Sequence, residues 1–214
     1  PNNQEGLNEM KYKIFVSGAQ KELKKERRAV KEFVREDILL SEYFDIFLFE
    51  DFPAKSKSAQ TAYIEEVRKS DIYIGILGQQ YGGAGKGKIS PTEAEFREAK
   101  AKHKEILIYI KGQNTVDKRR ETGIQDLIKE MKNPKAGHSY RRFEDADDLT
   151  NLVYESLISF LKEKGEIGKA GFDQRICKGA KLSDIDNAKV KWFLKVARAK
   201  RNFPLGLDSS IKDV

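Results

Sequence analysis

The stretch Asp71-Ile72-Tyr73-Ile74-Gly75-Ile76-Leu77-Gly78 decides the fold that this chain is expected to adopt. Five of the six residues from Ile72 to Leu77 are apolar, and the sixth is Gly75. A short apolar run bounded by turn residues is typical of a central parallel strand that helices cover on both faces. Further glycines follow the strand as far as Gly87. Ligands of open α/β sheets bind beyond the carboxyl ends of such strands, so a site is expected here.

Strands and helices alternate along the chain on either side of this stretch. Apolar runs predict four further strands, at residues 12–16, 43–49, 106–110 and 140–143. Apolar residues spaced three and four apart, with capping and stop signals, predict helices at residues 20–35, 59–69, 90–102, 124–131 and 149–164. This alternation predicts an α/β fold of flavodoxin-like size: a parallel sheet of about five strands with helices on both faces.

The chain divides into three parts. Residues 1–10 are polar and are predicted to form a disordered leader, and residues 11–165 hold the α/β domain. Residues 166–214 begin with a glycine-rich linker and continue into a basic helix, a C-terminal helical extension that is too short to bury a core of its own. This extension packs back on the domain, swaps with a neighbour, or begins a second domain.

The overall composition restricts the classes of function. The 214 residues carry a net charge of +7 and have a pI of about 9.2, which fits either nucleic-acid binding or solvated lysine-rich helices. Cys177 is the one cysteine, so no intramolecular disulfide forms, which suits a cytoplasmic protein. No apolar run approaches the roughly 20 residues of a membrane span. The two histidines have no metal-like neighbours in the sequence, so no metal site is predicted.

Three predicted strand ends meet at one edge of the sheet. They carry Ser17 and Gly18, then Glu50, then the glycine-rich loop that starts at Gly78. Backbone N–H groups of such a loop can hold a phosphate, although a glycine-rich loop is as often only a flexible surface loop. The spacing matches neither a P-loop nor the dinucleotide fingerprint.

Two acids open the helix that follows the loop, for which Ser90 or Thr92 is the expected N-cap. Glu93 and Glu95 are two residues apart, so only one of them can point deep into the crevice. Acids in a first helical turn commonly serve the helix dipole. The functional alternative is a carboxylate that holds a ribose hydroxyl or stabilises an oxocarbenium-like centre during N-glycosidic cleavage, with Glu50 as a second acid.

Four ordered motifs resemble a TIR-like family of unknown function. They are Ile14-Phe15-Val16-Ser17-Gly18 with Glu22-Leu23 and Glu26-Arg27, Glu50-Asp51-Phe52-Pro53-Ala54, Ser70 to Gly78 with Tyr81-Gly82, and Ser90-Pro91-Thr92-Glu93-Ala94-Glu95-Phe96 with Ala99. The match covers roughly residues 12–112. The chain departs from the family at Gly18, where a second serine is frequent, so a hydroxyl role at this position is in doubt.

The resemblance implies a relative of TIR domains and of nucleoside deoxyribosyltransferases. In those proteins a glutamate on the helix after the glycine-rich loop cleaves or holds the N-glycosidic bond of NAD or a nucleoside. Glu95 fits that position, with Glu93 as the second choice. NAD or another nucleotide is then the ligand or substrate, and no cofactor is required. The expected ligand-binding residues are Ser17, Gly18, Glu50, Gly78, Tyr81 and Gly82.

A second resemblance, over some thirty residues near Ser183-Asp184-Ile185-Asp186, is to regulators and ATPases of the RecG and Schlafen-AlbA type. It implies a longer protein with a downstream domain. Two further interpretations stay open beside the nucleotide-binding or NAD-cleaving one: a self-associating module without enzyme activity, and DNA binding through the basic extension. The basic side chains concerned are Lys189, Lys191, Lys195, Arg198 and Arg201.

Overall fold

The structure is a computed structural model that describes residues 11–51, 59–83, 89–114, 116–133, 135 and 137–167. The predicted leader and nearly all of the basic extension, with its five candidate DNA-binding side chains, lie outside the described residues. Within the described ranges, none of the helices combines the length and the apolar character needed to cross a membrane.

The core of the fold is one parallel sheet of five strands in the order β2-β1-β3-β4-β5. The strand predicted from the opening stretch is β3 (Ile72–Leu77), which lies in the middle of the sheet with every residue buried. The other strands are β1 (Tyr12–Ser17), β2 (Phe44–Phe47), β4 (Glu105–Lys111) and β5 (Tyr140–Phe143).

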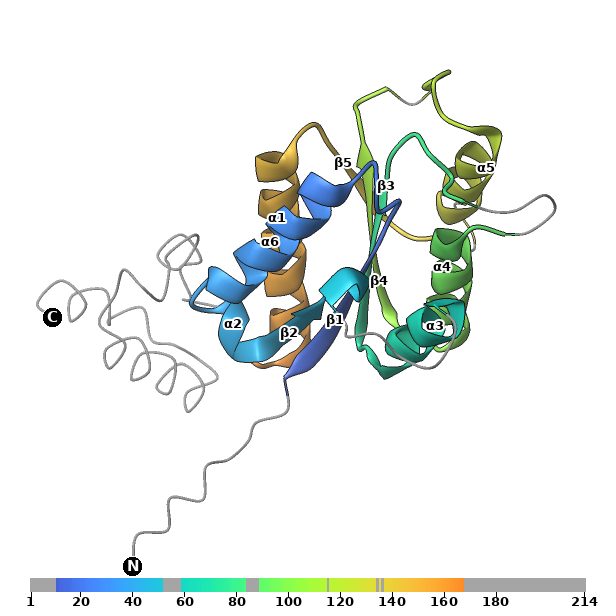
Figure 1. The fold of residues 1–214 in the computed structure, drawn as a ribbon. Helices are drawn as coiled ribbons and strands as arrows, with labels where there is room; N and C mark the ends of the chain where they lie inside the picture. Colours follow the sequence, from blue (N-terminus) through green and yellow to red (C-terminus); the bar gives the residue numbers. More distant parts are fainter. Residues whose placement is uncertain are drawn as a thin grey trace, which may run out of the picture.

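Helices cover both faces of this sheet, as Figure 1 shows. Helices α1 (Lys24–Glu36) and α6 (Ala146–Lys164) pack together on one face. Helices α3 (Ala59–Lys69), α4 (Pro91–Ala101) and α5 (Thr122–Met131) lie on the other. The strand order and the two helical layers are those of a flavodoxin-like α/β fold, so the predicted fold class is confirmed.

Alternate residues of β3 supply the two halves of the core. Ile72, Ile74 and Ile76 pack in the cluster under α1 and α6, whereas Tyr73 and Leu77 pack in the cluster under α3, α4 and α5. Because neighbouring strand residues point to opposite faces, a continuous apolar run is what a strand covered on both sides requires.

The region around β2 differs from the prediction. The expected strand 43–49 is only Phe44–Phe47, because short helical turns flank it: α2 (Leu40–Tyr43) before it and η1 (Phe49–Asp51) after it. The Asp37 carboxylate accepts hydrogen bonds from the backbone N–H groups of Leu39 and Leu40, both at 2.9 Å, which starts α2. Sequence periodicity does not detect a turn of this length.

The ends of two helices were predicted with different success. Of the two predicted N-caps of α4, Ser90 is the one used, and Pro91 follows in the first turn. Helix α1 begins at Lys24, four residues later than the predicted start, and the intervening residues form a loop at the site described below. Gly165 ends α6 with a left-handed φ of 74°, and Ile167 beyond it is still buried in the core.

Candidate functional site

A cavity of about 280 Å³ lies beyond the carboxyl ends of β1 and β3. The strand order reverses between these two strands, and this switch point is where doubly wound folds bind ligands. The wall comes from the loop after β1, from α1, η1 and α3, from the loop after β3, and from the start of α4. Its side chains include Phe15, Lys21, Arg27, Phe49, Tyr63 and Glu95.

Glu95 is the acid that the structure places at this cavity. Its side chain comes from the second turn of α4, is only 5% exposed, and accepts a short hydrogen bond from the Ser17 hydroxyl at the end of β1. Burial raises the pKa of Glu95 to about 7, while the Ser17 hydrogen bond and the charge of Arg27 oppose that rise. The carboxyl group therefore changes its charge near neutral pH, as groups that transfer protons or stabilise cations often do.

Buried Arg27, which also lines the cavity, forms an ion pair with the partly exposed Glu50. The two terminal nitrogens of Arg27 donate to the two carboxylate oxygens of Glu50 at 3.0 and 2.9 Å. One of them also donates to the backbone oxygen of Val16 at 3.4 Å. Glu50 was predicted as a second acid, but this bidentate contact commits its carboxylate to Arg27 rather than leaving it free for a sugar.

Aromatic side chains cover one side of the cavity. The rings of Phe49 and Tyr63 contact each other with their centroids 3.6 Å apart. Gln20, which also lines the cavity, donates to the Tyr63 hydroxyl at 3.2 Å and so joins the loop after β1 to α3. An aromatic wall opposite a few polar groups is common in small-molecule sites.

Glu93 lies on the same helix but faces elsewhere. Its carboxylate accepts a short hydrogen bond from the Tyr81 hydroxyl and forms a short ion pair with Arg97, one turn further along α4. Neither Glu93 nor Tyr81 lines the cavity within the described residues. The structure thus separates the two acids, as their spacing predicts, and brings Glu95 alone to the cavity wall.

The first part of the glycine-rich loop holds the chain's own carboxylates. The Glu22 carboxylate accepts from the backbone N–H groups of Gln79 and Gln80, at 2.6 and 2.9 Å, and Glu121 accepts from that of Tyr81 at 2.7 Å. These three N–H groups are among those that the sequence suggested as a phosphate cradle. A side chain on Gly78 would overlap the Glu22 carboxylate, so glycine is needed here to admit it.

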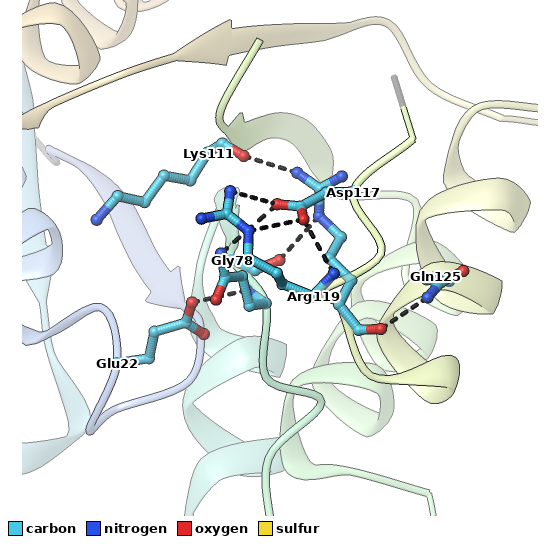
Figure 2. Close-up of polar contacts among 8 residues, drawn as sticks. Glu22, Gly78, Lys111, Asp117, Arg119 and Gln125 are labelled. Carbon is cyan, nitrogen blue, oxygen red and sulfur yellow. Dashed lines mark hydrogen bonds and ion pairs between the residues drawn. The ribbon is translucent and has the colours of Figure 1, made fainter. Parts of the chain in front are cut away.

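Figure 2 shows the other polar contacts that hold this loop. The buried Arg120 guanidinium donates to the backbone oxygens of Gly78 and Lys111, at 3.2 and 2.7 Å. The backbone N–H of Glu121 donates to the oxygen of Gln79 at 2.9 Å. The N–H groups of residues 79–81 and the oxygens of residues 78 and 79 are thereby bonded within the protein, so these groups are not free to hold a phosphate.

The predicted ligand-binding residues therefore fall into three groups. Gly18 and Gly82 line the cavity directly. Ser17 and Glu50 contact cavity residues, namely Glu95 and Arg27. Within the part of the chain that the structure describes, Gly78 and Tyr81 do not line the cavity; Gly78 lies against Glu22, and Tyr81 contacts Glu93. In the described part of the chain, no three His, Cys, Asp or Glu side chains come together as a metal site would require.

Sequence reasoning did not assign Arg27, Glu22, Phe49 or Tyr63 to the site. Arg27 and Glu22 belong to one of the quoted motifs, and that was the available signal. Their roles depend on the path of the loop after β1, which carries Glu22 toward β3 and Arg27 toward η1. Spacing along the chain does not reveal that path.

A comparison with protein families identifies the chain. Residues 13–158 match the family described as "Domain of unknown function (DUF4062)", so the chain belongs to that family. A search of curated proteins found no significant match.

Solved structures with related folds include two of low identity. The CMP N-glycosidase BcmB of Clostridium botulinum is 13% identical, with a TM-score of 0.43, over 67% of this chain and 98% of the other. Oxidised flavodoxin 1 of Bacillus cereus is 14% identical, with a TM-score of 0.34, over 71% of this chain and 96% of the other. Likenesses at this level carry no information about the reaction.

Proposed function

We propose that this member of the DUF4062 family binds a nucleotide-like ligand in the cavity and that Glu95 acts on its N-glycosidic bond. The observation that carries the proposal is the state of Glu95: a carboxyl group that is 5% exposed, lines the cavity, and has a pKa raised to about 7 by burial. Among the described residues, Ser17 is the hydrogen-bond donor to its carboxylate.

The cavity suits the reacting part of such a ligand. Its volume of about 280 Å³ is near the lower end of the usual range for ligand sites, roughly 300–1,000 Å³. A nucleoside fits that space better than a complete dinucleotide, so the remainder of NAD would extend out of the cavity. The Phe49–Tyr63 pair offers an aromatic surface to a base, and Glu95 faces the same space.

A buried carboxylate suits the proposed chemistry. As the C1′–N bond breaks, its electron pair leaves with the base and positive charge develops at C1′ of the sugar. Ionised Glu95 stabilises that charge. A water oxygen then bonds to C1′. One proton of this water passes to the departing base. When the substrate is NAD, the ribosyl pyridinium leaves as neutral nicotinamide, and the proton passes to solvent instead. The products are the free base and the sugar with a hydroxyl at C1′.

The test is the release of free base by the full chain. NAD and a panel of nucleoside monophosphates are incubated with the protein, and products are separated by chromatography. We expect release from at least one of them, and a loss of about 10²–10⁴-fold in the Glu95→Gln variant, which keeps the shape but never ionises.

Glu93→Gln is the matched comparison, because it changes a second buried acid of the same helix that faces away from the cavity. We expect it to retain most of the activity. Activity that disappears in E93Q but survives in E95Q would assign the reaction to Glu93. No release from any substrate, together with no heat of binding in calorimetry, would refute the proposal.

Self-association, a downstream domain and DNA binding through the basic extension stay predictions. A salt-dependent shift of DNA mobility that vanishes on truncation at Gly165 tests the last of these.

A further inference from the structure

The role of Arg27 is not explained by the proposed reaction. A guanidinium that is 2% exposed is costly to bury, and its fixed charge lies at the wall of a ligand-sized cavity. Its Nε atom is buried and has no hydrogen-bond acceptor among the described residues. A purely structural arginine is normally saturated with acceptors, so some other requirement keeps this one in place.

The backbone at the end of β1 connects Arg27 to Glu95. Arg27 reaches over the strand end from α1 and donates to the oxygen of Val16. The next residue, Ser17, donates its hydroxyl to Glu95, which comes from α4 on the opposite face of the sheet. The cation and the acid are therefore held on two consecutive residues of one buried strand, and both line the cavity.

Glu50 keeps the guanidinium in this position. The bidentate contact at 2.9 and 3.0 Å fixes its plane, and η1 places Glu50 next to the Phe49 ring of the cavity wall. The two charges of the pair act on Glu95 in opposite directions. The cation of Arg27 lowers the pKa of the Glu95 carboxyl group, and the anion of Glu50 raises it.

We propose that Arg27 is an electrostatic positioning residue: held by Glu50, its charge keeps Glu95 ionised when a ligand fills the cavity and removes water from it. The inference rests on the proposed function, in which ionised Glu95 acts on the ligand. The effect of Arg27 on the ionisation of Glu95 can nevertheless be tested without any substrate. Other groups also face Glu95. They are Ser17 from β1, Glu50 from η1, Tyr63 from α3 and Tyr73 from β3.

The experiment follows the Glu95 carboxyl carbon by NMR in the full 214-residue chain labelled with ¹³C-glutamate, with E95Q used to assign the signal. The midpoint of its titration is compared in wild type, R27Q, E50Q and the double variant R27Q/E50Q. Removing the cation should move the midpoint up by about one pH unit, and removing the anion should move it down. The double variant should lie between the two single variants.

If the pair has only a structural role, both single variants loosen the same contact. The titration midpoint of Glu95 then shifts in the same direction in R27Q and E50Q, or does not shift in either. Each of these two results would overturn the proposal. If R27Q alone does not fold, E50Q and the double variant still decide, because the midpoint must be lower in E50Q than in the double variant; equal midpoints would contradict the inference. R27K, which keeps the charge, should stay near wild type.

The rate of base release gives a second readout. R27Q should release base several-fold more slowly than wild type at pH 7 and approach it as the pH rises. If the NMR shifts appear but no substrate is cleaved, the proposed function fails while the electrostatic coupling stands. If base is released and the midpoints do not move, the inference fails alone.

Discussion

Carboxylates on the two sides of the loop after β3 are held in opposite ways. Glu22 and Glu121, which are half-buried and exposed, accept three backbone hydrogen bonds from the loop, and Arg120 binds two backbone oxygens. Glu95 is buried, yet among the described residues it accepts one hydroxyl donor beside a cavity. The first arrangement stabilises the fold, whereas the second leaves a carboxyl group poised to change its charge.

The largest effect on stability is expected from Gly78→Ala, in the part of the loop that Glu22 holds. A methyl group there would overlap the Glu22 carboxylate and release it from the N–H groups of Gln79 and Gln80. The overlap itself is relieved by moving the flexible end of the Glu22 side chain, so the loss comes from its two charge-assisted hydrogen bonds, which together contribute about 4 kcal/mol to the free energy of unfolding. Urea denaturation of both proteins measures the difference.

The matched control is the same substitution at the other end of the loop. Gly83→Ala places its methyl group in open space, so it should change stability by less than about 0.5 kcal/mol. Equal losses in the two variants would show that Glu22 does not hold the loop.

The next effect concerns Glu95 at the cavity, where a substitution is expected to increase the free energy of unfolding instead of lowering it. The unfolded chain loses the Glu95 proton near pH 4.5, but the folded chain keeps it up to about pH 7, because burial raises the pKa. Stability contributed by the protonated group is therefore present below about pH 4 and lost as the pH rises to about 7. This loss totals about 3 kcal/mol.

E95Q has no proton to lose at this position. Relative to wild type it should gain up to about 3 kcal/mol between pH 5 and pH 8. Denaturation curves at the two pH values measure this gain, with E32Q, at an exposed position of α1, as the control that stays constant. A gain that does not grow with pH would mean that Glu95 titrates as it does in the unfolded chain.

A smaller loss is expected from Glu22→Gln. The amide keeps one acceptor oxygen but presents a donor to the second N–H, so one charge-assisted hydrogen bond is lost, which costs about 2 kcal/mol. Amide hydrogen exchange at Gln79 and Gln80 should become faster while that of the β3 core does not change. Unchanged exchange at both amides would contradict the role assigned to Glu22.

Much of the fold follows from the sequence because it depends on short-range patterns. The apolar run of β3 and the alternation of elements predict the parallel sheet and its two helical layers, and Ser90 with Pro91 predicts the start of α4. The preference for Glu95 over Glu93 came from a resemblance, and the structure places Glu95 alone at the cavity.

The contacts between loops could not be predicted in this way. The loop after β1 brings Glu22 to the first part of the expected phosphate cradle, and α1 beyond it brings Arg27 to the expected second acid, Glu50. Both outcomes depend on the path of the six residues of irregular backbone between Ser17 and Lys24, and not on any periodic pattern.

The most direct test of the account is the pH dependence of base release by the full chain. With a saturating substrate, wild type should become faster as the pH rises through about 7, because Glu95 acts in its ionised form, and E95Q should show no such rise and almost no release. A wild-type rate that does not change between pH 5 and pH 8, or one that survives in E95Q, would contradict the assignment of the reaction to Glu95.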